Sequence, residues 1–419
     1  MQQLLPGWFV RWLDTDLSYL IKSGGWTGIG QVFGTFMGLA TAYAFANYLP
    51  QDTYGTYKYV LATIALLSIP TLSGLNTVVV QAIAQHADGT AWAAMRRKFS
   101  FGLLSTVGGL CLGGYYFFNN ENVLGWAFTI AAFAIPVMES LSTAQAVLIG
   151  KKRFDIAARQ TILTSLVSAT AVIAAIVLTR NPLWIIGAYL GATLVGRLIT
   201  FLVSRQFIEN TTISEENLRF GMHMSAVAVL GIIAGNVDMF LLWHTATAQT
   251  LALYAFALAT VSPFQSLIKT ILNLVQPKFA TQTPDQLRFT VPRRAHQTLL
   301  LLIPMIVAAI IALPWLYQIL FPNYAAAVPF AQVLMLSAAL YSEKFYGIAL
   351  VTMRQTKAMY TLNTINTVVK IGLLAVLIPL FGGWGAVAAI LTQNVIAILV
   401  TRYFFYRHVR QNSPLPENS

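Results

Sequence analysis

The chain has 419 residues, of which 57% are hydrophobic and only 10% are charged, and its mean hydropathy is +0.66. This composition is far more apolar than that of a soluble domain, so a soluble globular protein is excluded. The net charge of +12 implies no nucleic-acid partner, because the basic residues follow the topology of a membrane protein. Cys111 is the only cysteine, which excludes an intramolecular disulfide, and its apolar surroundings predict a buried side chain.

Residues 1–23 place hydrophobic side chains at helical spacing, which predicts a cytoplasmic amphipathic segment along the membrane interface. Apolar runs follow, each near the length of about 20 residues that a helix needs to cross a bilayer. The twelve runs are roughly 24–49, 57–84, 99–118, 123–149, 161–179, 183–207, 220–243, 249–276, 297–320, 328–352, 359–380 and 384–406. The sequence therefore predicts an all-α polytopic membrane protein with twelve transmembrane helices.

The basic residues indicate which way the chain faces. Most of the 26 Lys and Arg residues fall on alternate connecting segments, such as Arg96 to Lys98 and Lys151 to Arg153. By the positive-inside rule, these segments and both termini are expected in the cytoplasm.

The runs divide into two sets of six around a hydrophilic linker. The predicted parts are the N-terminal segment 1–23, an N-lobe at 24–207, the linker at 208–219, a C-lobe at 220–406 and a cytoplasmic tail at 407–419. Tyr57–Thr63 and Tyr254–Thr260 both read Tyr-x-aromatic-x-Leu-Ala-Thr. Since each half has an even number of spans, we expect a parallel repeat, with substrate sites near the midplane between the lobes.

No sequence pattern for catalysis or nucleotide binding is present. Gly150-Lys151-Lys152 lacks the upstream glycine and the following Ser or Thr of a phosphate-binding loop, and no metal-ligand spacing occurs. We therefore expect no enzyme activity, no cofactor and no metal site, while coupling to Na⁺ or H⁺ is left open. The loops are short, which argues against a membrane glycosyltransferase or polymerase with large substrate-holding loops.

Seven charged residues fall inside the predicted spans. Each costs about 2.5–3.5 kcal/mol at the centre of a membrane helix on insertion scales, so these side chains should face the bundle interior or a wet cavity. They are Glu139, Arg197, Asp238, Lys269, Glu343, Lys344 and Lys370.

These charges have two interpretations. In the first, the cations lie on polar helix faces and form a cavity for an anionic substrate. The predicted substrate-binding residues are Lys269, Arg197, Lys370, Lys344, Gln265, Asn273 and Asn366. In the second, the cations pair with Glu139, Asp238 and Glu343 and hold the helices together. For Asp238 we expect a cation from another helix or a coupling ion.

Several stretches resemble the polysaccharide-transporter branch of the multidrug/oligosaccharidyl-lipid/polysaccharide (MOP) flippase superfamily, the Wzx-type O-antigen flippases. Ala46–Tyr57 is similar to that family's "L-G-P-x-x-F/Y-G-x-Y" after the first span. Asn236-Val-Asp238 and Tyr254-Ala-Phe-Ala resemble its "N-x-D" and "Y-x-x-A", and Leu320–Tyr324 resembles its "L-F-G-x-x-Y". The chain departs from the family at Pro322, where a glycine is common, and in lacking a charge in the first span.

The resemblance implies a flippase of the bacterial inner membrane that moves an undecaprenyl-pyrophosphate-linked oligosaccharide outward by alternating access, for polysaccharide or lipopolysaccharide biosynthesis. It implies as partners membrane lipids and the polymerase or glycosyltransferases of the same pathway. The alternative within transport is a multidrug/cation antiporter. Four cations against three acids at membrane depth favour an anionic substrate instead.

Overall fold

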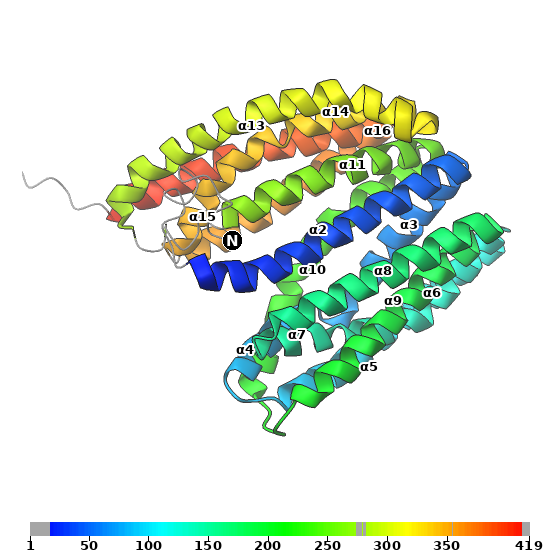
Figure 1. Cartoon of the computed structure of the whole chain (residues 1–419), viewed down its shortest axis with the longest axis horizontal. Coiled ribbons are helices and arrows are strands. Elements are labelled where there is room, and N and C mark those ends of the chain that lie inside the picture. Colours follow the sequence, from blue (N-terminus) through cyan, green and yellow to red (C-terminus); the bar gives the residue numbers. More distant parts are fainter. Residues whose placement is uncertain (1–16, 274–278, 280–281, 354, 413–419) are drawn as a thin grey trace, which may run out of the picture. The chain divides into compact units, whose positions relative to one another are not determined.

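The computed structural model describes residues 17–273, 279, 282–353 and 355–412, and these residues form helices and their connections without a strand (Figure 1). The first half contains α2 (Leu17–Tyr48), α3 (Gln51–Leu67), η2 (Ile69–Thr71), α4 (Leu75–Ala84), α5 (Thr90–Phe118), α6 (Asn122–Leu141), α7 (Thr143–Gly150), α8 (Phe154–Thr179), α9 (Pro182–Ser204) and η3 (Arg205–Phe207). The second half contains α10 (Glu215–Thr245), α11 (Ala248–Asn273), α13 (Pro284–Leu320), η4 (Pro322–Ala327), α14 (Val328–Leu336), η5 (Ala339–Glu343), α15 (Lys344–Thr352) and α16 (Thr356–Asn412).

The all-α polytopic fold is confirmed. Among the described residues, eight helical segments are long and apolar enough to cross a membrane, or nine if the bent pair 51–67 and 69–84 is one span. Each of the twelve predicted runs overlaps one of the helical segments. The last two runs share α16, where Gly382 has φ 55° and breaks the helix between them. A continuous helix of 57 residues would be about 86 Å long at about 1.5 Å per residue, whereas the hydrocarbon core of a bilayer is only about 30 Å thick.

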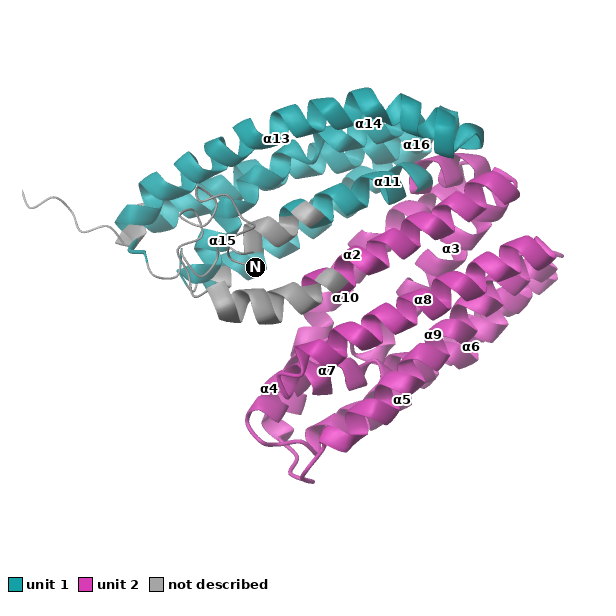
Figure 2. Ribbon diagram, viewed as in Figure 1, with its two compact units in different colours: residues 1–20, 256–419 teal, residues 21–255 magenta. Residues whose placement is uncertain are grey.

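The chain forms two compact units, unit 1 (residues 1–20 and 256–419) and unit 2 (residues 21–255) (Figure 2). In unit 2, α5 packs on α6, α8 on α9, and α10 on α3 and α4. In unit 1, α13 packs on α14, and α15 packs on α16. The predicted lobes with a boundary at 208–219 remain a prediction, and the compact units divide later, between residues 255 and 256.

Unit 2 holds α10 by close backbone packing. A Cβ atom on Gly74 would lie 2.4 Å from the backbone nitrogen of Ser225, so only glycine fits there. The backbone N–H of Gly74 donates to Ser225 Oγ at 3.1 Å. Leu75 and Val78 of α4 and Leu218 of α10 belong to one fully buried apolar cluster.

A polar contact fixes residues 208–214, which connect η3 to α10. Asp88 is fully buried, and its Oδ2 accepts from the backbone N–H of Glu209 at 2.9 Å and from Lys151 Nζ at 2.9 Å. Asn210 Oδ1 accepts from the backbone N–H of Asp88 at 3.0 Å. We call Asp88, Lys151, Glu209 and Asn210 the linker contact.

The linker contact shifts the pKa values of its charged groups. Burial alone would raise the pKa of Asp88, but the hydrogen bonds from Lys151 and from the Glu209 backbone outweigh it and lower that pKa below its usual 3.8. Burial would lower the pKa of Lys151, but the Asp88 and Glu209 carboxylates raise it above its usual 10.5. Both ions are therefore stabilised in the folded state at neutral pH.

Candidate functional site

Two interrupted spans bring polar groups into the interior of unit 2. The second span breaks between α3 and α4, where Leu72 has φ 57°, and the fourth breaks at Ser142 between α6 and α7. At each break the helical hydrogen-bond pattern is disturbed, so polar side chains can replace backbone partners. Asn76 lies at the start of α4, and its Nδ2 donates to Ser142 Oγ at 3.0 Å.

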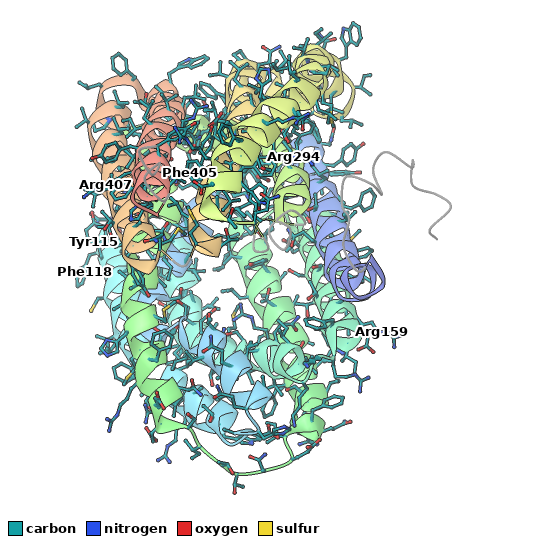
Figure 3. All side chains as sticks on the ribbon, turned by 90° about the vertical axis from the view of Figure 1, so that its left-hand side faces the viewer. Tyr115, Phe118, Arg159, Arg294, Phe405 and Arg407 are labelled. Atoms are coloured by element: carbon teal, nitrogen blue, oxygen red, sulfur yellow. The ribbon has the colours of Figure 1, made fainter. Side chains whose placement is uncertain are left out.

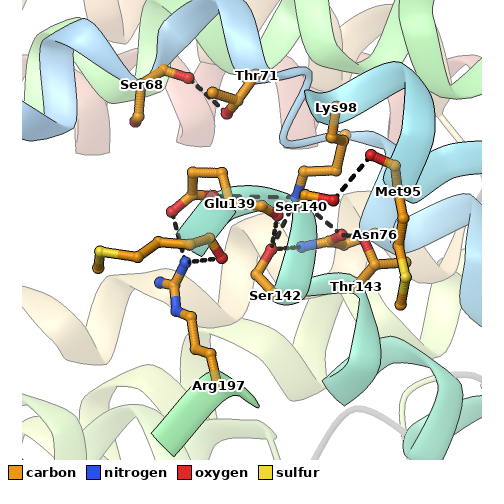
Figure 4. Close-up of polar contacts among 12 residues, drawn as sticks. Ser68, Thr71, Asn76, Met95, Lys98, Glu139, Ser140, Ser142, Thr143 and Arg197 are labelled. Atoms are coloured by element: carbon orange, nitrogen blue, oxygen red, sulfur yellow. Dashed lines mark hydrogen bonds and ion pairs between the residues drawn. The ribbon is translucent and has the colours of Figure 1, made fainter. Parts of the chain in front are cut away.

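Lys98, near the start of α5, lies among these groups with its side chain fully buried. Its Nζ donates to Asn76 Oδ1 at 3.1 Å and to Ser142 Oγ at 2.7 Å, and Glu139 Oε2 lies 3.9 Å away (Figure 4). A buried ammonium is tolerated only when such partners satisfy it.

Arg197 of α9 reaches the same group from the other side. Its Nη1 donates to Glu139 Oε1 at 2.9 Å and to the backbone carbonyl of Met138 at 2.5 Å (Figure 4). A guanidinium carries five N–H donors, and Nη1 supplies two of them. The donors on Nε and Nη2 form no hydrogen bond to a described residue, and the side chain is 28% exposed.

We call Lys98, Glu139 and Arg197 the unit 2 charge cluster. It holds two cations against one carboxylate, within helices that are long and apolar enough to cross a membrane. Buried charges are normally balanced, so this excess of positive charge is the chemical property that distinguishes the cluster.

Unit 1 contains a second Glu–Arg pair, which links η5 to α16. Arg402 donates to Glu343 through Nε at 2.8 Å and through Nη2 at 2.7 Å, a bidentate geometry. Glu343, Lys344 and Asn366 line a cavity of about 400 Å³. Lys344 Nζ lies 3.8 Å from the ring centroid of Tyr341, a cation–π distance.

The contacts inside the two units correspond, which supports the predicted repeat. Glu139 pairs with Arg197 and Glu343 pairs with Arg402, and each glutamate lies where a span is interrupted. The recurring Tyr-x-aromatic pattern also makes like contacts. Tyr59 packs edge-on against Tyr116, with 6.4 Å between ring centroids. The equivalent Phe256 packs edge-on against Tyr317 at 5.8 Å.

The other predicted site residues are distributed as follows. Gln265 donates to Ser337 Oγ at 3.0 Å and accepts from the Tyr341 hydroxyl at 3.0 Å, so its amide links two helices. Lys370 forms no ion pair with another described residue. The side chains of Lys269 and Asn273 lie outside the described part of the structure, so their roles stay predictions.

Two expectations from the sequence need correction. Among the described residues, no cation pairs with Asp238: its Oδ2 accepts from the Tyr254 hydroxyl at 2.6 Å, while the coupling-ion alternative stays a prediction. A hydroxyl satisfies a buried carboxylate without a second charge, which residue spacing alone could not indicate. Cys111 is exposed rather than buried. In a membrane helix, apolar composition does not separate the packed face from the lipid face.

Sequence reasoning missed Lys98 and Arg402 as site residues, and it placed Lys98 in a cytoplasmic segment with Arg96 and Arg97. Helical spacing was the available signal for Lys98, because it is in phase with Gly102, Ser105 and Gly109 on the buried face of α5. Arg402 carried no comparable signal. Its partner Glu343 is 59 residues away in sequence.

The arrangement of apolar spans, interrupted helices and internal charge pairs defines a polytopic membrane protein with the fold of the MOP transporters. A search of solved structures finds the "Lipid II flippase MurJ, inward closed conformation" at a TM-score of 0.68 and 14% identity, covering 90% of this chain and 86% of that one. An inward-facing multidrug resistance MATE transporter of the MOP superfamily matches at 0.67 and 13% identity, covering 90% and 95%. A MOP superfamily transporter from Pyrococcus furiosus matches at 0.62 and 12%, covering 94% and 96%.

The family described as "Polysaccharide biosynthesis protein" matches residues 20–281, and the chain belongs to this family. No curated protein matches the chain by sequence. The structural neighbours are a flippase and multidrug transporters. The chain is therefore a multi-pass membrane protein of this family, with the fold that the MOP transporters share.

Proposed function

We propose that this protein is a flippase that carries an undecaprenyl-pyrophosphate-linked oligosaccharide from the cytoplasmic to the outer leaflet of a bacterial inner membrane. The family description supports a role in polysaccharide biosynthesis, and the fold is that of lipid-linked substrate flippases and related transporters. The sugar headgroup crosses through the protein while the polyprenyl tail stays in the bilayer.

The excess positive charge of the unit 2 charge cluster carries this proposal. Lys98 is committed to Asn76 and Ser142, so Arg197 is the cation of the cluster with donors to spare. A guanidinium with free N–H groups is suited to a phosphate, which offers several acceptor oxygens and negative charge. Arg197 is thus the proposed contact for the pyrophosphate, and Lys269, Lys370 and Lys344 remain proposed cations along the path.

A multidrug/cation antiporter is the alternative within the same fold. Such a carrier needs carboxylates that can receive an organic cation. The membrane-depth acids are already occupied: Glu139 contacts Arg197 and Lys98, Glu343 contacts Arg402, and Asp238 contacts Tyr254. This occupancy favours an anionic substrate.

Transport in proteoliposomes tests the proposal, with lipid-linked oligosaccharide in one leaflet and its appearance in the other as the readout. Arg197→Gln removes the charge, and losing a charge-assisted hydrogen bond of about 1.5–3 kcal/mol predicts an initial rate about 10 to 160 times lower. Arg197→Lys should retain part of the rate. Arg159→Gln is the matched control, because Arg159 is exposed on α8 (Figure 3).

Equal rates for Arg197→Gln and the wild type would contradict the proposal. The same vesicles address energetics, since outward movement of each negative charge is favoured by about 2.3 kcal/mol per 100 mV, inside negative. A rate that follows an imposed Na⁺ or pH gradient but not the potential would instead indicate ion coupling.

A further inference from the structure

The cavity of about 400 Å³ in unit 1 is a second candidate binding site with a different chemistry from the unit 2 charge cluster. It lies between η5, α15 and both halves of α16, and its wall includes Tyr341, Asn366, Asn394 and Thr401 besides apolar side chains. Its volume is in the range of about 300–1,000 Å³ that is typical of small-molecule pockets. Figure 2 shows α15 and α16 in unit 1.

The charges in the cavity wall are already engaged. Both carboxylate oxygens of Glu343 accept from Arg402. The Lys344 ammonium lies over the Tyr341 ring, and the Lys344 residue is exposed. The wall therefore offers an incoming cation no free carboxylate, and its remaining positive charge, on Lys344, lies over the Tyr341 ring.

The uncharged polar groups of the wall are less satisfied. Asn366 Oδ1 is buried and accepts no hydrogen bond from the part of the chain that the structure describes. A buried amide oxygen left without a donor costs about 1–3 kcal/mol, which a rotation of the Asn366 side chain toward a donor in the cavity would recover. Asn394, on the facing half of α16, forms no hydrogen bond to a described residue.

We propose that this cavity binds an uncharged sugar residue of the transported glycan, an inference that rests on the flippase function proposed above. A sugar hydroxyl both donates and accepts, so it can satisfy Asn366 and Asn394 in either amide orientation. A fully ionised phosphate can only accept and cannot satisfy the amide oxygen. A metal cation would find amide and hydroxyl oxygens but no carboxylate free of Arg402.

Labelling of an engineered cysteine tests the proposal on the purified full-length protein. Ile398→Cys, in the Cys111→Ala background, introduces the reporter, because Ile398 lines the cavity. The probes are glucose, galactose and N-acetylglucosamine at up to about 100 mM, a concentration that would fill even a site with a Kd of about 1 mM. We expect at least one sugar to slow maleimide labelling of residue 398 threefold or more.

The controls separate binding in the cavity from general effects. Leu399→Cys is the matched reporter, because Leu399 is the adjacent residue and is 61% exposed. Its labelling should not respond to sugar. Asn366→Leu keeps the size of the side chain but removes its acceptor, so it should abolish protection of residue 398. Asn394→Leu serves the same purpose if Asn366→Leu does not fold.

Three outcomes would overturn the proposal: no protection by any of the sugars, protection by inorganic pyrophosphate instead, or protection by NaCl alone. Because this readout needs no transport, its failure is distinct from failure of the flippase proposal. Loss of transport in Arg197→Gln together with unprotected residue 398 would keep the flippase and reject the sugar cavity.

Discussion

At the residue scale, the burial of Lys98 is the least expected feature. A basic segment at a membrane boundary predicts solvent-exposed side chains, but the Lys98 side chain is buried. Its neighbours Arg96 and Arg97 keep contact with solvent, whereas Lys98 turns inward along a stripe of small residues. The ammonium satisfies Asn76 and Ser142, so it joins the two interrupted spans. Through Glu139 it also fixes the carboxylate that holds Arg197.

Lys98→Met should destabilise the protein markedly. The substitution keeps the length of the side chain but removes the hydrogen bonds from the charged Lys98 to Asn76 and Ser142, each worth about 1.5–3 kcal/mol, while Thr143 and Asn76 still donate to these two acceptors. Arg97→Met is the matched control, because the Arg97–Glu215 pair is exposed and such pairs contribute about 0–1 kcal/mol. Thermal unfolding in detergent measures both. Equal unfolding temperatures for Lys98→Met and the wild type would show that the buried contacts are not stabilising.

At the element scale, the connection between η3 and α10 is a fixed part of unit 2. The linker contact binds it to the loops that follow α4 and α7. Ser214 then begins α10, accepting from the N–H of Asn217 in the position of an N-cap. A segment whose composition predicts a hydrophilic linker is therefore ordered by hydrogen bonds at both ends.

Asp88→Asn should release this segment at neutral pH. Removing one partner of a buried ion pair costs about 3–5 kcal/mol, and Lys151 would keep only the more exposed Glu209. Hydrogen exchange of the amides in residues 208–214 measures the release. Asp155→Asn is the matched control, since the Asp155–Arg153 pair lies at the surface.

The same contact gives a pH dependence whose direction follows from the shifted pKa values. The folded-state pKa of Asp88 is below 3.8, so its stabilisation is present above that value and is lost as the pH falls further. The folded-state pKa of Lys151 is above 10.5, so its stabilisation is present below that value and is lost as the pH rises. Protection of residues 208–214 should therefore be highest between about pH 4 and pH 10. Unchanged protection in Asp88→Asn would contradict this account.

At the scale of the whole molecule, the fold could be predicted from the length of the apolar runs and from the recurring pattern at Tyr57 and Tyr254. Both signals lie in the local sequence. The candidate site followed only in part. Glu139 and Arg197 were singled out as separate charges, but their pairing depends on contacts between helices far apart in sequence. The sequence predicted a cation as a partner of Asp238, but the structure shows the Tyr254 hydroxyl there. Residue spacing could not predict this contact, because it depends on side-chain geometry.

The orientation of the molecule remains a prediction of the positive-inside rule and can be mapped with cysteines. In the Cys111→Ala background, which should retain function because Cys111 is exposed, cysteines at Asp52 and Asn323 should react with an impermeant thiol reagent from outside intact cells. A cysteine at Lys152 should react only after the membrane is opened. Labelling of residue 152 in intact cells would overturn the twelve-span topology.

The recurrence of a Glu–Arg pair in each unit bears on the ancestry of the chain. A six-helix ancestor with one such pair would insert in the same orientation in every copy, because an even number of spans returns the chain to its starting side. Two copies could then associate as a symmetric homodimer without any inversion. Gene fusion through a short cytoplasmic connection would preserve that dimer, and each half would afterwards be free to diverge. The engaged Glu343 and the excess charge around Arg197 would be products of that divergence.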